Sequence, residues 1–420
     1  MKPETAPASP ITPLVGPSLA DVEAAREAVS RVAVVTPMES SRYLAELLGS
    51  DVFLKCENLQ RTGSYKIRGA YNRMAKLSAE ERARGVVAAS AGNHAQGVAL
   101  AARELGIAAT IFMPVGVALP KLQATRRYGA EVVLRGHTVD EPLRAAAEFA
   151  ETTGAILIPP FDHADIVAGQ GTLGLEILDQ VPTLETVIVP IGGGGLIAGI
   201  ATTLKQLGAR AGRTFRVIGV QAANSASYPV SLRNGEPTSI TITPTIADGI
   251  AVSRPGDLNF KIIQQAVDEI VTVSDDEIAR ALLVLLERAK LVVEPAGAAA
   301  GAAIVTGKVR NTGTTVAILS GGNIDPLVME RVIGLGLAAS DRYLKFRLTL
   351  PDRPGQLARV SNLISEVNAN VVEVQHTRHG RGALISDVEL ELSLETRGPE
   401  HVRQVLDRLR EDGYDPRVEF

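Results

Sequence analysis

Lys66 stands in the stretch TGSYKIRGAYN, between Gly63 and Gly69 and next to the apolar side chains of Tyr65 and Ile67. A lysine ordinarily rests its aliphatic stem on apolar surface and keeps its ammonium group in water. An amine that is withdrawn from water loses proton affinity and becomes a nucleophile. Lys66 is therefore either an ordinary surface lysine or a reactive amine, and the other motifs of the chain decide between the two.

Four consecutive glycines, Gly192 to Gly195, follow the apolar run TVIVPI and precede the helical pattern LIAGIATTL. Their backbone N–H groups can converge on an anion, and the positive end of the following helix adds to the attraction. A phosphate group is the natural ligand, and an ordinary tight turn is the alternative. The run lacks the Gly-Lys-Ser/Thr ending of a nucleoside triphosphate loop and the spaced glycines of a dinucleotide site.

Two further turns of small residues follow apolar runs: Ser90-Ala91-Gly92-Asn93-His94 and Ser320-Gly321-Gly322-Asn323. The first opens a helix whose N-terminus can hold a small carboxylate, while the Asn93 side chain can bond a neighbouring group. Helix capping by Asn93 and His94 is the other interpretation. A phosphate turn, a carboxylate turn and an unusual lysine together indicate pyridoxal phosphate acting on an amino acid.

The elements that must position these residues alternate in type from about Ser18 onward. Apolar runs of strand length are separated by Ala- and Leu-rich segments of helical length, which predicts an α/β protein with a mainly parallel sheet. The expected strands cover residues 86–90, 109–114, 130–136, 155–160, 186–192, 215–221 and 315–322. Ligands bind beyond the carboxyl ends of such strands, where the three turns of small residues lie.

The pattern changes after residue 341, where strands and helices follow in the order βαββαβ. This order is typical of a ferredoxin-like unit. We therefore predict a separate domain at 342–420, a catalytic domain at 18–335, and a disordered leader at 1–17, which is rich in Pro, Ala, Ser and Thr.

The composition excludes several classes of protein. The chain of 420 residues is 45% hydrophobic and 21% charged, with a formal net charge of -4 and no long basic block, which disfavours a nucleic-acid partner. No apolar stretch is long enough for a membrane helix. Cys56 is the only cysteine, which fits a reducing compartment. We expect a cytoplasmic protein with no membrane association.

The motifs SYKIRGA, SAGNHAQG, GGGGL and SGGN occur in this order and resemble those of the fold-type II pyridoxal-phosphate enzymes. The likeness over about residues 19–335 is to the threonine/serine dehydratases (threonine ammonia-lyases). It implies two parallel-type α/β domains like those of the tryptophan synthase β-subunit, with a small subdomain inserted at about 66–160. The stretch LPDRPGQLARV is similar to the start of an ACT domain, a module that senses amino acids.

The resemblance implies a role for each matched residue. Lys66 would form a Schiff base with pyridoxal 5'-phosphate and act as the catalytic base. Gly192, Gly193, Gly194, Gly195 and Leu196 would bind the cofactor phosphate, Asn93 its phenolic oxygen, and Ser320 its pyridine nitrogen. Ser90, Ala91, Gly92, Asn93 and His94 would hold the substrate carboxylate.

The implied reaction converts L-threonine to 2-oxobutanoate and ammonia, and L-serine to pyruvate and ammonia. A hydroxyl such as that of Ser320 does not force protonation of the ring nitrogen, which favours elimination over transamination. This sequence differs from the family pattern at two places, and each difference limits which family properties it is expected to share. Ala91 replaces a serine that serine-racemising members have, so racemisation is not expected. Gln221, Ser225 and Ser227 replace the acidic residues that bind a divalent cation in some relatives, so no metal is assigned.

The ACT-like segment would bind isoleucine or valine between subunits of a homotetramer, near Asp352, Pro354, Gly355, Leu357 and Asn370, and thereby regulate the enzyme. A pairing module without a ligand is the alternative for this segment. Three alternatives stay open for the whole chain: a dehydratase that prefers serine or 3-hydroxyaspartate, a catalytically silent amino-acid sensor, and a β-replacement synthase. The sequence does not separate isoleucine biosynthesis from amino-acid breakdown.

Overall fold

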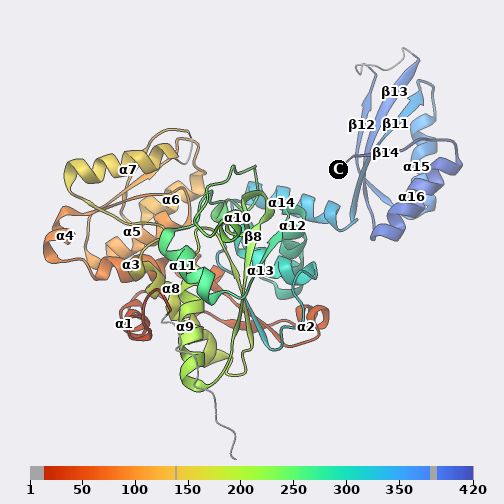
Figure 1. Ribbon diagram of the computed structural model, residues 1–420. Coiled ribbons are helices and arrows are strands. Elements are labelled where there is room, and N and C mark those ends of the chain that lie inside the picture. The colour runs from red at the N-terminus through yellow and green to blue at the C-terminus, as the bar shows by residue number, and fades with distance from the viewer. Residues whose placement is uncertain (1–13, 138–139, 379–385, 420) are drawn as a thin grey trace, which may run out of the picture. The chain divides into compact units, whose positions relative to one another are not determined.

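The structure is a computed structural model that describes residues 14–137, 140–378 and 386–419. The chain forms two compact units, and Figure 1 labels many of their elements. One takes in the chain up to Ile278 together with Val284–Asp325, and the other takes in Ala279–Leu283 together with Pro326–Phe420. Of the expected leader, residues 1–13 lie outside the described part. Leu14 and Val15 pack against the core, and the Val15 N–H donates to Gln265 Oε1 at 2.9 Å.

The first unit contains two sheets. The larger has the order β1-β2-β10-β7-β8-β9, and all its pairs are parallel except β1 with β2. Its strands are β1 Met38–Ser40, β2 Val52–Lys55, β7 Thr186–Pro190, β8 Arg216–Ala222, β9 Glu269–Val273 and β10 Thr315–Ile318. The smaller sheet is parallel throughout, in the order β5-β4-β3-β6. Its strands are β3 Val86–Ala89, β4 Ala109–Met113, β5 Glu131–Leu134 and β6 Ile156–Leu157.

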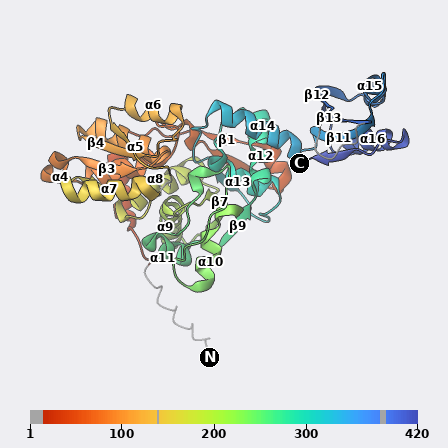
Figure 2. The same ribbon diagram turned by 90° about the horizontal axis from the view of Figure 1, so that it is seen from above.

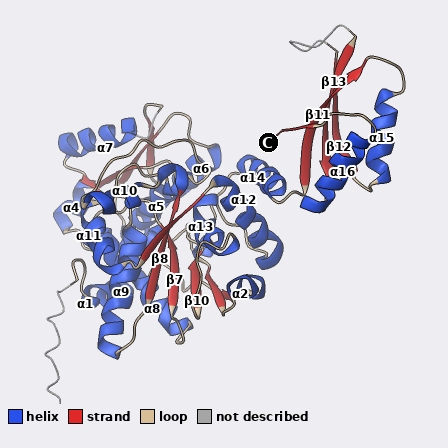
Figure 3. Cartoon of the chain, turned by 45° about the vertical axis from the view of Figure 1, so that its right-hand side comes forward, coloured by secondary structure: helices blue, strands red, loops and turns tan. Residues whose placement is uncertain are grey.

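Helices surround both sheets. In Figure 2, α5, α6 and α7 gather around β3 and β4, and Figure 3 shows β7, β8 and β10 among the other helices. The helices that begin in this unit are α1 Leu19–Val29, α2 Arg42–Leu48, α3 Lys66–Ala75, α4 Ala79–Arg84, α5 Asn93–Leu105, α6 Leu119–Arg127, α7 Asp140–Thr153, α8 Ala164–Gln180, α9 Gly195–Ala211, α10 Ser227–Asn234, α11 Asp257–Ala266, α12 Asp275–Val284 and α13 Pro295–Val305. No helix among the described residues is long and apolar enough to span a membrane.

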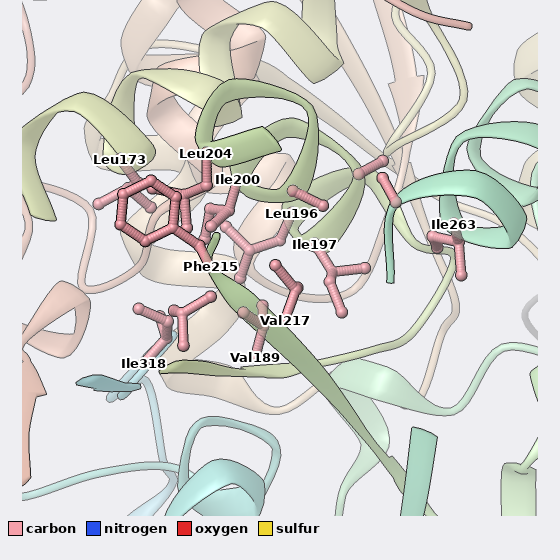
Figure 4. Packing of buried hydrophobic residues seen from close by; sticks show 14 of the residues in the cluster. Leu173, Val189, Leu196, Ile197, Ile200, Leu204, Phe215, Val217, Ile263 and Ile318 are labelled. Atoms are coloured by element: carbon pink, nitrogen blue, oxygen red, sulfur yellow. The ribbon is translucent and has the colours of Figure 1, made fainter. Parts of the chain in front are cut away.

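The main hydrophobic core lies between the large sheet and helices α8 and α9 (Figure 4). Leu173 of α8, Ile200 of α9, and Val189 and Val217 of the sheet are fully buried in it. Because both faces of the central strands are covered, those strands read as continuous apolar runs in the sequence. The packed core fixes the carboxyl ends of β7 and β10, from which two of the small-residue turns leave.

The predicted α/β class and mainly parallel sheet are confirmed. All seven predicted strands form, although most are shorter than expected because the last residues of each run already belong to the turns at the carboxyl edge. Sequence analysis missed β1, β2 and β9. The first two have three and four residues, and β9 is a half-buried edge strand without a continuous apolar pattern.

The C-terminal unit contains an antiparallel sheet in the order β12-β13-β11-β14. Its elements are β11 Tyr343–Pro351, α15 Gln356–Glu366, β12 Asn370–Thr377, β13 Asp387–Glu395, α16 Pro399–Glu411 and β14 Arg417–Glu419, which confirms the predicted βαββαβ order. Helix α14, Pro326–Ala339, groups with this unit, although the sequence analysis assigns residues up to 335 to the catalytic domain. Gly336 of α14 packs directly against Ala279 and Leu283 of α12.

Candidate active site

The carboxyl ends of several strands bring the predicted residues to one region of the first unit. The glycine run connects β7 to α9, and Ser320 to Asn323 follow β10, which pairs with β7 in parallel. In the small sheet, Ser90 to Asn93 connect β3 to α5, and Pro160 follows the neighbouring strand β6. The contacts of Lys66, Asn93 and Ser320 join these loops to one another.

Lys66 is the first residue of α3 and is half-buried. Its Nζ donates to the carbonyl oxygen of Pro160 at 3.1 Å and lies 5.3 Å from the centroid of the Tyr65 ring. Within the described part of the chain, no carboxylate forms an ion pair with this amine. The lysine is therefore held by a neutral acceptor and an aromatic face, which is unlike an ordinary surface lysine.

Main-chain bonds tie the segment before Lys66 to the turn after β10. The Tyr65 N–H donates to the carbonyl oxygen of Ser320 at 3.2 Å, and Ser64 forms a β-bridge with Gly321. The Gly322 N–H donates to the Gly63 carbonyl oxygen at 2.8 Å. Ser320 itself is buried. These bonds place the turn that contains Ser320 beside the segment that leads into Lys66.

The glycine run presents its N–H groups without protein partners. Among the described residues, none of the N–H groups from Gly192 to Leu196 donates to a protein acceptor. The Gly193 carbonyl oxygen is instead fixed by Tyr228 Oη at 3.1 Å and Asn259 Nδ2 at 3.0 Å. Five adjacent free donors at the start of α9 fit a phosphate group. The Leu196 side chain lies in the core, so only its N–H is available to a ligand.

Gly194 shows why this loop needs glycine. Its φ of 96° lies in the left-handed region, and a Cβ there would stand 2.1 Å from Tyr228 Oη. Any side chain would displace the tyrosine that fixes the neighbouring Gly193 carbonyl oxygen. The loop geometry thus depends on the absence of side chains.

The turn after β3 has similar free donors. The Gly92 N–H donates to Ser90 Oγ at 3.1 Å, whereas the N–H groups of Ala91, Asn93 and His94 find no acceptor within the described ranges. The His94 side chain is buried, and its Nε2 lies 2.9 Å from the Ile158 carbonyl oxygen. Burial, and secondarily the charge of Lys66, lower the pKa of His94 to about 3, so its ring is neutral. His94 therefore offers the site its N–H rather than its imidazole.

Asn93 lies between the side chains of Glu294 and Asn323, and the sequence analysis did not predict these two contacts. Its Nδ2 donates to Glu294 Oε1 at 2.6 Å, and its Oδ1 accepts from Asn323 Nδ2 at 2.8 Å. Burial raises the pKa of Glu294 to about 7. Glu294 and Asn323 are 201 and 230 residues away from Asn93, so no local spacing reveals the contact. The only hint was their position in VVEPAG and directly after a Ser-Gly-Gly turn.

The polar group at Gln221, Ser225 and Ser227 does not resemble a divalent cation site. All three residues are fully buried, and Gln221 Nε2 and both serine hydroxyls lack partners in the described structure. Gln221 Oε1 accepts from the Tyr228 N–H at 2.9 Å. Divalent cations such as Mg²⁺ are usually bound through carboxylates, and these side chains are neutral. No group of three or more His, Cys, Asp or Glu that could hold a metal exists among the described residues.

The structure does not bring all the expected effector residues together within one chain. Asp352, Pro354, Gly355 and Leu357 lie between the end of β11 and the first turn of α15, where Asp352 pairs with Arg378 at 3.1 Å. Asn370 begins β12 and pairs across the sheet with Glu395, which also pairs with Tyr343 at the start of β11. Asn370 is therefore at the opposite end of the sheet.

Within the described residues, the glycine run has N–H donors without protein acceptors, and the Lys66 amine has no ion-pair partner. Such an arrangement matches the chemistry of pyridoxal phosphate, which needs a phosphate cradle and a reactive lysine. The family model described as pyridoxal-phosphate dependent enzyme matches residues 29–321, and the ACT domain model matches residues 346–413. The chain belongs to the family of pyridoxal-phosphate-dependent enzymes, and pyridoxal phosphate is its cofactor.

Its relatives narrow this class further. An L-threonine ammonia-lyase of Thermotoga maritima is 46% identical over 402 residues, covering 96% of this chain and 99% of the relative. The catabolic L-threonine dehydratase of Escherichia coli strain K12 is 46% identical over 317 residues, covering 74% and 94%. The structure of processed threonine deaminase isoform 2 from Solanum lycopersicum is similar with a TM-score of 0.71 and 38% identity, covering 80% of this chain and 99% of that one.

Proposed function

We propose that this chain is an L-threonine ammonia-lyase, which releases 2-oxobutanoate and ammonia from L-threonine and pyruvate and ammonia from L-serine. The observation that supports the proposal is a set of contacts that join the loops carrying Lys66, Asn93 and the glycine run. The Lys66 amine donates to the Pro160 carbonyl oxygen, and the next residue, Phe161, lies against Gly193 and Gly195. Asn93 and Tyr65 both bond to the turn after β10. The relatives of this name match nearly the whole chain, including its ACT segment.

Pyridoxal phosphate, when bound, supplies an electron-accepting ring that acidifies the Cα proton of an attached amino acid. Lys66 would hold the cofactor, and its amine would take up the Cα proton of the substrate. The N–H groups of Gly192 to Leu196 would bind the cofactor phosphate, and Asn93 would bond its phenolic oxygen. Ser320 would bond the ring nitrogen, and its neutral hydroxyl would favour rapid loss of a β-substituent.

The turn from Ser90 to His94 orients the substrate by holding its carboxylate on free N–H groups. The Cα–H bond breaks toward the Lys66 amine, and the β-hydroxyl leaves as water. The released enamine tautomerises to an imine, and water hydrolyses it to 2-oxobutanoate and ammonia. Ala91 offers no side-chain acid on this turn, which supports elimination without racemisation.

The test is a steady-state assay of 2-oxo acid release from threonine, serine and 3-hydroxyaspartate. Threonine and serine differ by one methyl group, which is worth about 1–3 kcal/mol in a pocket, so we expect a kcat/KM ratio of roughly 10 to 200 in favour of threonine. A preference for serine or 3-hydroxyaspartate would replace threonine as the main substrate. No product from any of the three would support the silent sensor and contradict the proposal.

The C-terminal unit adds regulation. We propose that residues 342–420 form the regulatory domain, residues 18–335 the catalytic domain, and about 66–160 its small subdomain. Because Asp352 and Asn370 lie at opposite ends of one sheet, an effector site that uses both needs two chains, in line with a homotetramer that binds isoleucine or valine at paired ACT domains. The single, buried Cys56 supports a cytoplasmic location.

A further inference from the structure

Glu294 is buried, with 5% of its surface exposed, and lies at the N-cap position of α13. An N-cap carboxylate commonly accepts a hydrogen bond from the first turn of its own helix, but the Glu294 side chain makes no such bond. Its Oε1 instead accepts from Asn93 Nδ2 at 2.6 Å. The carboxyl group of Glu294 therefore bonds a residue of the candidate active site rather than the first turn of α13.

The orientation of the Asn93 amide follows from a chain of hydrogen bonds with a fixed direction. Asn323 Nδ2 donates to the main-chain carbonyl oxygen of Thr62 at 2.7 Å and to Asn93 Oδ1 at 2.8 Å. A carbonyl oxygen can only accept, so the NH₂ group of Asn323 must face both acceptors. Asn93 must then turn its own NH₂ group toward Glu294, and an ionised carboxylate, which can only accept, holds it there.

Gly321 leaves the space that this arrangement needs. A Cβ at position 321 would lie 2.1 Å from Glu294 Oε1, and the Glu294 N–H donates to the Gly321 carbonyl oxygen at 3.0 Å. The same turn bonds Tyr65 through Ser320. Glu294 is thus built into the network that carries Lys66, Asn93 and Ser320.

No cation pairs with Glu294 among the described residues, and its hydrogen-bond partner is a neutral amide. Burial and the charge of Asp248 raise the pKa of Glu294 to about 7, against the opposing effects of the Asn93 bond, Lys121 and Lys66. Lys121 pairs with Asp248 at 3.0 Å, and the neighbouring His94 is neutral. Glu294 is the group in this network that changes its charge near neutral pH.

We propose that Glu294 is a positioning residue: its carboxylate holds the Asn93 amide in the orientation that retains pyridoxal phosphate, and protonation of this carboxylate loosens that hold. The inference rests on the proposed function, because Asn93 acts through its contact with the cofactor. A charge-assisted bond is about twice as strong as a neutral one, so the loss of charge weakens the hold without breaking the contact.

The experiment measures the affinity of the cofactor-free full-length protein for pyridoxal phosphate, by absorbance titration from pH 5.5 to 8.5. The variants are Glu294→Gln, Asn93→Ala, the double variant, and Glu269→Gln as a control. Glu269 is a partly exposed acid that pairs with Arg216 at 2.6 Å, so its variant also removes one negative charge. Changes in the protonation of free pyridoxal phosphate affect all variants equally. Their effect cancels when the affinity profile of one variant is divided by that of another.

We expect the ratio of the wild-type affinity to the Glu294→Gln affinity to fall by roughly tenfold as the pH is lowered from 8.5 to 5.5. This is the size of effect expected when one buried charged hydrogen bond is weakened. Glu294→Gln should lack this step, and Glu269→Gln should keep it. Asn93→Ala should bind weakly at every pH, and the double variant should bind no more weakly than Asn93→Ala alone.

A pH step in Glu294→Gln equal to that of the wild type would overturn the inference, and so would independent, additive losses in the double variant. Thermal unfolding of each variant confirms that it is folded. A wild-type protein that takes up no pyridoxal phosphate at any pH would instead contradict the proposed function, and this inference with it.

Discussion

Among single residues, Gly194 of the glycine run can be compared with a matched glycine at the other end of the same helix. Gly194 and Gly212 both have positive φ, 96° and 63°, near the two ends of α9. A Cβ at Gly194 would meet Tyr228 Oη at 2.1 Å, whereas a Cβ at Gly212 would meet nothing within 4 Å. Comparing alanine at the two positions separates backbone strain from damage to the loop.

Gly194→Ala should lower the affinity for pyridoxal phosphate by about tenfold or more, because strain and displacement of Tyr228 each cost on the order of 1–3 kcal/mol. Gly212→Ala should cost about 1 kcal/mol of stability and leave the affinity unchanged. Absorbance titration of the cofactor-free variants measures the affinities. Equal affinity in both variants would show that the loop does not hold the phosphate.

His94 should make the fold sensitive to acid. Burial lowers the pKa of its imidazole from 6.5 to about 3, so the unfolded chain takes up the proton more readily than the folded one. The stabilising contribution is therefore complete above pH 6.5 and is lost as the pH falls toward 3, by up to roughly 1.4 kcal/mol per pH unit.

We expect the urea midpoint of the wild type to fall from pH 6.5 to pH 4, and more steeply than that of His94→Gln, whose amide can still donate to Ile158. His376→Gln, at an exposed position in β12, is the control and should follow the wild type. Parallel profiles for wild type and His94→Gln would contradict the assignment of a buried, neutral imidazole.

The candidate site residues that the sequence suggested belong to short motifs. Each of them can be recognised from consecutive residues alone, without knowledge of the fold. This holds for Lys66, Asn93, the glycine run and Ser320. Glu294 and Asn323 were missed as partners of Asn93 because their contacts join positions more than 200 residues apart. His94 was expected to hold substrate, and only the hydrogen bond between its Nε2 and the Ile158 carbonyl oxygen shows that its side chain is engaged elsewhere.

Among the elements, α3 carries Lys66 and is fixed by a buried group of charges that the sequence did not reveal. Arg68 makes bidentate contacts with both Glu57 and Glu176, at distances of 2.6–3.0 Å. Lys55 of β2 pairs with Glu176 at 2.8 Å. These four side chains are almost wholly buried and join α3 to β2 and α8. Removal of one member leaves the others uncompensated in the interior.

Arg68→Met should therefore destabilise the first unit by about 3–5 kcal/mol, the usual cost of breaking a buried ion pair. Arg26→Ala removes the pair with Asp179, whose side chains are 49% and 58% exposed, and should cost about 0–1 kcal/mol. Thermal unfolding of the two variants measures the difference. Similar unfolding temperatures would show that the buried charges do not stabilise α3.

The long apolar strands and the βαββαβ order were predictable because burial on both faces, or on one, leaves a regular pattern in the sequence. Strands β1, β2 and β9 were not predictable, since three to five residues at or near a sheet edge carry too little pattern. The sequence also did not predict that α14 groups with the C-terminal unit, because this grouping depends on packing against α12 rather than on local sequence.

For the whole molecule, the C-terminal unit predicts a response to branched-chain amino acids. Four of the five expected effector residues lie around the exposed loop after β11, and β12 is largely exposed along its length. If isoleucine or valine binds between the C-terminal units of two chains, it should change activity by roughly 5- to 150-fold, the usual range for coupled sites. It should also raise the unfolding temperature. Leu357→Asp, in the first turn of α15 next to that loop, should abolish both effects while basal turnover stays the same. Unchanged activity and unfolding temperature with either amino acid would leave a pairing module without a ligand.

The lysine that binds pyridoxal phosphate covalently can be identified by chemical labelling. Borohydride reduction of the purified enzyme followed by peptide mapping should place a reduced pyridoxyl phosphate group on the peptide that contains Lys66. Lys76→Ala, at the other end of the same helix, should map identically, and Lys66→Ala should carry no label and release no 2-oxobutanoate. A label on any other lysine, or on none, would contradict the assignment.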